Sequence, residues 1–346
     1  MDPIALDERI GTLDYLRGFA LLGIILVNIL GLLTVKTPAL HSVDAVYQRF
    51  LYFFVEARFY PIFSFLFGVG FYLFIARANT RGENGAILFL RRILVLFIFG
   101  FIHFLFQPGE ALTVYASCGL LMLPFYKIKK EVNLFTGCIL LLFVSIFAAK
   151  IFMPLPLILL GLSAGQYRIF EKLARYKTET AIFTFFMFIL SVGGLLLQYC
   201  YVPEQPFNNL NGLEKNYQNM DQLKWFLHLG VATGPILSAF YAGFLLLLLQ
   251  APIARRLLSP LKSYGRMALT NYISQTALIL LAGKLFHLFN RITYLQSLWL
   301  CLAIYVIQLI FSAMWLKYCK FGPLEWVWRM MTYNRKFPIL LKKEAD

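Results

Sequence analysis

Charged residues are scarce in this chain. Only 14% of the 346 residues are Asp, Glu, Lys or Arg, against about 25% in ordinary soluble domains. Hydrophobic residues make up 60%, and the mean hydropathy is +0.70. A soluble fold of this size could not bury that much apolar surface. The composition therefore excludes a soluble enzyme, a disordered chain and a nucleic-acid-binding module.

Cysteine and histidine are also few. The five cysteines lie mostly within or beside apolar runs, and no two of them form a Cys-x-x-Cys pair. This spacing favours free cysteines that act as small hydrophobic side chains, and we expect no metal site.

Long apolar runs dominate what is present. A helix needs about 20 apolar residues to cross a bilayer core of roughly 30 Å. Ten segments are candidates: 15–34, 55–77, 87–106, 110–126, 133–151, 153–168, 180–201, 225–250, 265–289 and 295–317. The sixth is short and rich in Gly and Pro, so nine spans with a re-entrant segment is the alternative. We predict an all-α, polytopic transmembrane bundle of about ten spans.

The placement of the basic residues predicts the orientation. With a cytoplasmic N-terminus and ten spans, most of the 32 Lys and Arg residues fall in alternate loops on the inner side, as the positive-inside rule requires. Both termini are then cytoplasmic, and the net charge of +15 becomes a topology signal and a surface for anionic lipid. We expect no cleavable signal peptide. We expect one integral membrane domain over 1–346, with a basic cytoplasmic tail over 337–346 and no nucleic-acid partner.

Ionisable groups inside apolar runs are costly, so each is a candidate functional residue. Asp14 and Arg17 lie three residues apart and can pair on one helix face. Asn28 lies about three turns further along nearly the same face. The alternative is a juxtamembrane ion pair together with an Asn that bonds a neighbouring helix. Glu56 and Arg58 can pair or line a water-filled cavity.

A histidine and a carboxylate are expected to lie close together at the turn between the third and fourth predicted spans. His103 lies near the outer end of a span, and a short turn then delivers Glu110 to the next helix start, where the helix dipole favours a carboxylate. Such a pair suits general-base chemistry, and a structural hydrogen bond is the alternative. Arg91 and Arg92 mark the inner end of the same span, and His41 lies in the outer loop after the first span.

Further charges lie near the C-terminal end. A polar stripe that should face a cavity or another polar helix opens the ninth predicted span: Arg266, Thr270, Asn271, Ser274 and Gln275. At its cytoplasmic end, Arg266 could hold a phosphate. Glu325 and Arg329 are four residues apart and form a candidate helical ion pair, while Lys150 is expected to snorkel outward.

Five ordered blocks resemble the YeiB family of bacterial polytopic membrane proteins, over about residues 9–336. The blocks are 9–28, 59–71, 91–103, 265–276 and 321–329. The Leu-Asp-x-Leu-Arg-Gly run in the first block also resembles two membrane acyltransferase families, the acyltransferase 3 type and the heparan glucosaminide N-acetyltransferase type.

The resemblance implies an acyltransferase of the bacterial cytoplasmic (inner) membrane. Such an enzyme moves an acyl group, acetyl by expectation, from cytoplasmic acyl-CoA to a hydroxyl or amine of an extracytoplasmic glycan, lipid or peptide. Acyltransferase 3 proteins have a catalytic His where this chain has Asn28, so the base must lie elsewhere. His103, oriented by Glu110, is the first candidate and His41 the second, while Asn28 could stabilise the oxyanion.

The expected partners are coenzyme A, membrane lipid and the acceptor molecule, with a homodimer left open. The residues expected to hold coenzyme A are Arg17, Asp14, Arg266, Asn271, Arg91 and Arg92. The alternative function is a proton-coupled transporter or flippase, which intramembrane His, Lys and Glu would suit, although no repeat relates the two halves. A noncatalytic scaffold for another envelope enzyme is the third possibility.

Overall fold

The computed structural model describes residues 10–173, 175–207 and 220–341. This part of the chain is helical, and its extended pairing is one antiparallel bridge between Cys319 and Leu340. The all-α prediction is therefore confirmed for the described residues. The last five residues of the predicted basic tail, 342–346, and residues 208–219 between the seventh and eighth predicted segments lie outside them.

Fourteen α-helices and two short 3-10 helices are described. They are α1 (Gly11–Leu32), α2 (Val43–Phe54), α3 (Tyr60–Thr80), α4 (Gly85–Phe104), α5 (Leu112–Leu121), η2 (Leu123–Lys127), α6 (Lys130–Ile146), η3 (Lys150–Phe152), α7 (Pro154–Gln166), α8 (Lys177–Tyr199), α9 (Met220–Leu248), α10 (Pro252–Leu257), α11 (Ser259–Arg266), α12 (Ala268–Leu285), α13 (Tyr294–Tyr318) and α14 (Pro323–Tyr333).

Every predicted apolar segment corresponds to a helix. Within the described ranges, six helices are long and apolar enough to cross a membrane: α1, α3, α4, α8, α9 and α13. The other four segments form the shorter α5, α6 and α7 and the more polar α12. The six long helices indicate an integral membrane protein, whereas the count of ten spans and the side of the termini stay predictions.

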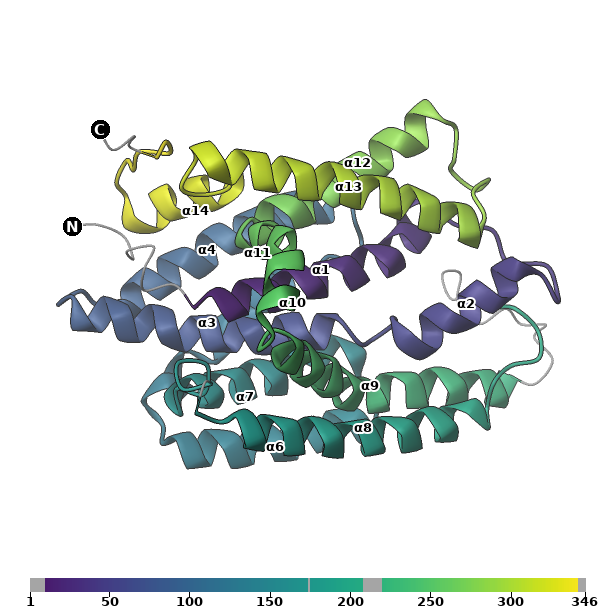
Figure 1. The fold of residues 1–346 in the computed structure, drawn as a ribbon, viewed down its shortest axis with the longest axis horizontal. Coiled ribbons are helices and arrows are strands. Elements are labelled where there is room, and N and C mark those ends of the chain that lie inside the picture. Colours follow the sequence, from purple (N-terminus) through teal and green to yellow (C-terminus); the bar gives the residue numbers. More distant parts are fainter. Residues whose placement is uncertain (1–9, 174, 208–219, 342–346) are drawn as a thin grey trace.

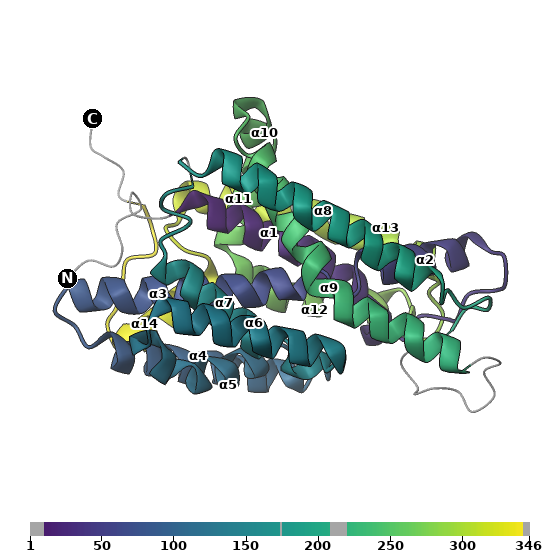
Figure 2. The same cartoon turned by 90° about the horizontal axis from the view of Figure 1, so that it is seen from below.

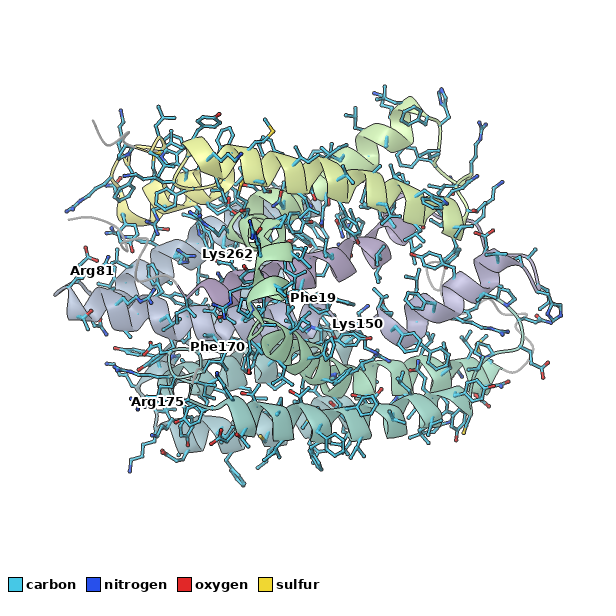
Figure 3. The ribbon with its side chains drawn as sticks, viewed as in Figure 1. Phe19, Arg81, Lys150, Phe170, Arg175 and Lys262 are labelled. Atoms are coloured by element: carbon cyan, nitrogen blue, oxygen red, sulfur yellow. The ribbon has the colours of Figure 1, made fainter. Side chains whose placement is uncertain are left out.

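The bundle is elongated and its helices are staggered. Most of the long helices run roughly along its longest axis, while α10 and α11 cross the middle (Figure 1). Seen from below, α4, α5, α6 and α7 end about midway along this axis, and α2, α8 and α9 continue beyond them (Figure 2). Arg81 and Arg175 lie toward the same end of the molecule as α14 (Figure 3). One end of the molecule therefore contains basic loops. The surface forms a step about midway, where α4 to α7 end and α2, α8 and α9 continue.

Glycines allow the closest helix contacts. A Cβ on Gly68 of α3 would lie 2.0 Å from the carbonyl oxygen of Ile158, and one on Gly161 of α7 would lie 2.0 Å from that of Phe65. Where α1 crosses α11, a Cβ on Gly265 would lie 1.8 Å from the carbonyl oxygen of Asp14. Small residues let membrane helices approach backbone to backbone, so the contact at Gly265 holds the start of α1, which contains Asp14, against α11.

A fully buried arginine holds the junction between α2 and α3. The Arg58 guanidinium donates hydrogen bonds to the carbonyls of Phe53 and Gly230 and to Gln198 Oε1. The side chain thus connects this junction to both α8 and α9. In place of the pairing considered between Glu56 and Arg58, Glu56 accepts a hydrogen bond from Lys150. Lys150 therefore does not reach outward alone, because its ammonium is bound by that carboxylate.

Gly265→Ala is expected to lower the thermal unfolding temperature of the purified protein. The added methyl would force α11 away from α1, and overpacking of this kind costs roughly 1–3 kcal/mol. Gly193→Ala is the matched control, because a Cβ there meets no atom within 4 Å. Thermal unfolding in detergent, followed by tryptophan fluorescence, measures both. Equal unfolding temperatures for the two variants would contradict the close contact.

Candidate functional site

Two cavities follow one another along α1 and α3. The first, of about 260 Å³, is lined by the start of α1 and the second half of α3, and we call it the basic cavity. The second, of about 400 Å³, is lined by the later part of α1, the junction between α2 and α3 and the turn that holds Glu110, and we call it the Glu110 cavity. Because α1 and α3 each line both cavities in succession, the two lie at different depths of one bundle.

Cationic side chains line the basic cavity. They are Arg17, Arg77, Arg92, Arg266, Lys320 and Arg329, and the acidic lining residues are Asp14 and Glu325. Arg17 Nη1 lies 3.1 Å from Asp14 Oδ1, as the predicted pair requires. The Arg92 guanidinium carbon lies 3.6 Å from the centre of the Trp328 ring, a close cation–π contact. The cavity therefore offers several positive charges and an aromatic face to an anionic molecule.

Glu325 connects α14 to the start of α12 and does not act as the helical partner considered for Arg329. Its carboxylate accepts hydrogen bonds from the backbone N–H groups of Leu269 and Thr270 and from the Thr270 hydroxyl. Those N–H groups belong to the first turn of α12, which lacks a bonding side chain at its own cap residue, Met267. Burial raises the pKa of the Glu325 carboxyl, although these hydrogen bonds act to lower it.

Some of the residues predicted to bind a cofactor line the basic cavity, and others do not. Asp14, Arg17, Arg92 and Arg266 line the basic cavity. Arg91 is exposed on the other face of α4 and is not among the residues that line this cavity. Asn271 is fully buried between helices, where its amide donates to the Tyr264 carbonyl and to Ser312 Oγ. Its contact is helix packing, which was the alternative considered for the polar stripe.

Three cationic residues of the basic cavity lie outside the predicted set. Arg77 is at the end of α3, while Lys320 and Arg329 flank or belong to α14. In the sequence, Arg77 and Lys320 belong to the basic residues that predict the topology, and Arg329 is the predicted partner of Glu325. Each belongs to a basic cluster in the sequence, but a cluster alone does not identify the residues that turn inward.

The Glu110 cavity is mostly apolar, with a few polar groups. Asn28, Glu56, Glu110 and Lys150 supply side-chain polar atoms, and Pro108, Gly109 and Ala111 contribute the turn before α5. Asn28 is half-buried at the wall formed by α1. His41 is exposed in the connection between α1 and α2 and is not among the residues that line this cavity.

Glu110 caps the first turn of α5. Its two carboxylate oxygens accept the backbone N–H groups of Leu112 and Thr113, and Oε2 also accepts the Thr113 hydroxyl at 2.9 Å. The residue at the cap position, Ala111, has no side-chain acceptor. Glu110 therefore supplies the acceptors that the cap residue lacks.

His103 lies directly behind Glu110. Its Nδ1 is 3.5 Å from Glu110 Oε1, and its Nε2 is 2.9 Å from the Thr276 hydroxyl oxygen. The Thr276 hydroxyl donates to Gln107 Oε1 at 2.7 Å, so the hydroxyl oxygen accepts from His103 Nε2. Nδ1 of His103 therefore faces Glu110 Oε1 across 3.5 Å. A proton placed between these two atoms could be shared by them.

Burial separates the roles that these two residues can take. Both are almost fully buried, but Glu110 contributes to the lining of a cavity, whereas His103 is not among the residues that line it. The predicted proximity of His103 and Glu110 is therefore observed, with the carboxylate nearer to the cavity. Sequence reasoning did not find Thr276 and Gln107, which the fold alone brings to His103.

Four residues line both cavities and form the wall between them. They are Phe63, Leu112, Tyr115 and Tyr272. The Tyr115 hydroxyl accepts from Ser64 at 3.3 Å and donates to the Tyr60 carbonyl at 3.4 Å. The Tyr272 hydroxyl accepts the Ala111 N–H at 3.4 Å, and the Tyr272 ring lies edge-on to His103. The shared wall is thus one side chain thick and contacts the turn that carries Glu110.

Six apolar helices, of which α1, α3 and α4 line the two stacked cavities, define the class as a helical integral membrane protein. Comparison with known proteins narrows this class. Residues 164–335 match the family described as "Protein of unknown function (DUF418)". The chain is 28% identical over 413 aligned positions to "Uncharacterized protein YxaH" of Bacillus subtilis (strain 168), covering all of this chain and 99% of the relative. It is 26% identical over 406 positions to "Uncharacterized protein YeiB" of Escherichia coli (strain K12), covering 97% and 99%. These similarities support the resemblance of this chain to the YeiB-like family.

Glu325→Gln is expected to change how stability depends on pH. A carboxyl whose pKa is raised in the folded protein contributes stability that is complete below its ordinary pKa and is lost as the pH rises through the folded value. Gln does not titrate. The stability of the wild type relative to Glu325→Gln should therefore fall as the pH rises above the ordinary carboxyl pKa of about 4.5, by about 1.4 kcal/mol for each unit of pKa elevation. Thermal unfolding across this pH range measures the difference, and a constant difference would contradict it.

Proposed function

We propose that this protein is a membrane acyltransferase that uses cytoplasmic acyl-CoA and acts on a hydroxyl or amine on the opposite side of the bilayer. In this proposal the bundle crosses the cytoplasmic membrane of a bacterium about ten times, and both termini are cytoplasmic. The observation that carries the proposal is the pair of stacked cavities, one cationic and one with a buried carboxylate, which share a thin wall. Arg81 and Arg175 lie toward the same end as α14, which supports a cytoplasmic basic cavity.

The donor would bind in the basic cavity. Arginine guanidinium groups hold phosphate oxygens through paired hydrogen bonds, and Arg17, Arg92 and Arg266 line this cavity from three different helices. Its volume of about 260 Å³ is below the range of roughly 300–1,000 Å³ that is usual for whole ligands. The nucleotide would therefore lie over the mouth, and the narrow pantetheine arm would enter toward Tyr115 and Tyr272.

Glu110 and His103 would act together as the base. The acceptor would lose its proton to the carboxylate that lines the cavity, and the proton would then be shared between Glu110 Oε1 and His103 Nδ1. The 3.5 Å distance between these atoms should shorten to about 2.8 Å once a proton lies between them. Thr276 and Gln107 are positioning residues, because they keep the proton of neutral His103 on Nε2.

The bonds made and broken follow from this arrangement. The acceptor oxygen or nitrogen attacks the thioester carbon, the carbon–sulfur bond breaks, and the thiolate of coenzyme A takes up the proton that the acceptor lost. The Asn28 amide lines the same cavity as Glu110 and can donate to the oxyanion that forms during the attack. The thioester must pass the shared wall, so movement of Tyr115 or Tyr272 would accompany each turnover.

Arg92→Gln is expected to weaken acetyl-CoA binding by about 10- to 100-fold, the loss of one hydrogen bond to a charged group of about 1.5–3 kcal/mol. Arg91→Gln is the matched control, because it removes the same charge from the neighbouring exposed position. Isothermal titration calorimetry of the protein in nanodiscs measures both. If the two variants bind acetyl-CoA equally well, the donor does not bind in the basic cavity.

Glu110→Gln is expected to lower the rate of acetyl-CoA consumption by about 10²- to 10⁴-fold, the usual contribution of a general base. Binding of acetyl-CoA should stay within twofold of wild type, since Glu110 is not among the residues that line the basic cavity. Thr276→Val should lower the rate less and should alter its pH profile, because His103 then loses the acceptor of its Nε2 proton. A wild-type rate in Glu110→Gln would rule out this carboxylate as the base.

A proton-coupled transporter or flippase is the second candidate. Two cavities separated by a thin wall are what alternating access requires, and buried Glu110 and His103 can carry a proton. This function predicts solute flux in proteoliposomes that follows a proton gradient and needs no coenzyme A. The absence of acetyl-CoA binding together with such a flux would favour transport over acyl transfer.

A further inference from the structure

The Glu110 cavity has apolar walls and a polar floor. Its apolar lining includes Leu21, Ile24, Val27, Phe59 and Val114, and we call the buried polar group of Glu110, Tyr115 and Tyr272 its floor. Its volume of about 400 Å³ lies within the range of roughly 300–1,000 Å³ that is usual for small-molecule sites. A water-soluble sugar or peptide would leave the apolar walls without contact. A molecule with one polar end and one apolar chain would match both parts.

The mouth of this cavity is bordered by surface that suits lipid chains. Ile151 lines the cavity and is also 66% exposed. Its exposed neighbours Phe147, at 63%, and Phe152, at 62%, continue the apolar surface on the outside of the bundle. In a membrane helix protein such side chains face the acyl chains of the bilayer. A chain could therefore pass from the bilayer into the cavity without crossing water.

The position of the mouth supports entry from the side. Lys150, next to Ile151, lies about midway along the longest axis of the molecule (Figure 3). The helices α4 to α7 end at this level, while α8 and α9 continue beyond it (Figure 2). The mouth therefore lies at the step where α4 to α7 end, and not at the far end of the bundle.

The charges around the cavity restrict the polar end of the molecule. Glu56 and Lys150 are bound to each other at the rim, so their charges compensate. Glu110 adds carboxyl oxygens that already accept hydrogen bonds from Leu112 and Thr113. A phosphate or carboxylate head would bring further acceptors to these oxygens, whereas a hydroxyl or an amine could donate a hydrogen bond to them.

We propose that the Glu110 cavity binds a membrane amphiphile whose head carries a hydroxyl or an amine and no anionic group. The head lies at Glu110, and the apolar chain follows the walls and leaves past Ile151 into the bilayer. That this amphiphile is the acyl acceptor rests on the proposed function, whereas its binding does not. With the amphiphile as acceptor, the acceptor class is no longer any glycan, lipid or peptide but a molecule held in the membrane.

Photolabelling in nanodiscs tests the site. The probe is octyl glucoside with a diazirine in its alkyl chain, and bound probe is located by peptide mass spectrometry. We expect labelling of residues that line the cavity, and about a tenfold loss of it in Gly109→Leu, whose new side chain occupies the site. Gly109 lines the cavity, and a Cβ there meets no atom within 4 Å, so the variant should fold. Gly193→Leu, on the exposed face of α8, is the matched control and should label as wild type.

A second variant and a competitor complete the experiment. Val27→Phe fills the cavity from the opposite wall and replaces Gly109→Leu if that variant unfolds. Glucose, which has the same head and no chain, should fail to compete with the probe. Equal labelling of the filled-cavity variant and Gly193→Leu, or competition by glucose, would overturn the amphiphile site.

The same samples separate this inference from the proposed function. Cavity labelling without any consumption of acetyl-CoA would contradict the proposed acyltransferase activity and support the amphiphile site. Acetyl transfer to free glucose as fast as to octyl glucoside, and unaffected by Gly109→Leu, would contradict the amphiphile site and support the acyltransferase activity. Faster transfer to octyl glucoside, lost in Gly109→Leu, would support both.

Discussion

A helix that begins inside an apolar bundle must find acceptors for its first backbone N–H groups, because water is not available there. Among the described helices, α5 and α12 are examples, and neither has a bonding side chain at its cap residue. In both cases a glutamate supplies the acceptors, Glu110 for α5 and Glu325 for α12. Each glutamate also lines one of the two cavities. Because the first N–H groups of α5 and α12 need acceptors, a carboxylate lies at each cavity.

The two capping glutamates differ in how they are held. Glu110 belongs to the turn directly before its helix, so its cap is local and rigid. Glu325 comes from α14, some 55 residues further along the chain, and joins the C-terminal helix to the rest of the bundle. Arg92 adds to this link through its contact with Trp328. The basic cavity is consequently closed by α14, and its shape depends on a contact between distant parts of the sequence.

Two pairs close in sequence were predicted correctly, whereas Glu56 pairs with Lys150 instead of Arg58, and Glu325 bonds the start of α12 instead of Arg329. Asp14 and Arg17 are one turn apart, and His103 and Glu110 are joined by a short turn, so helical periodicity and the turn itself bring each pair together. Residues that meet across helices were not predicted, because periodicity assigns a side chain to a face without saying which helix covers that face. Thr276 and Gln107 were missed for this reason, and Asn271 was expected at a cofactor but lies between α12 and α13. Lys150 was expected to point outward, but the fold brings Glu56 to it.

The amino-acid sequence by itself determined the class of the molecule. A chain this poor in charge and this rich in apolar runs can satisfy its backbone only as helices within a membrane, and the few charges inside those runs marked where polar chemistry could occur. Only the tertiary structure decided which of these charges face a cavity. Neighbours such as Arg91 and Arg92 differ little in sequence, yet one is exposed and the other lines the basic cavity. The difference is made by packing against α14, which is remote in the chain and therefore invisible to a local pattern.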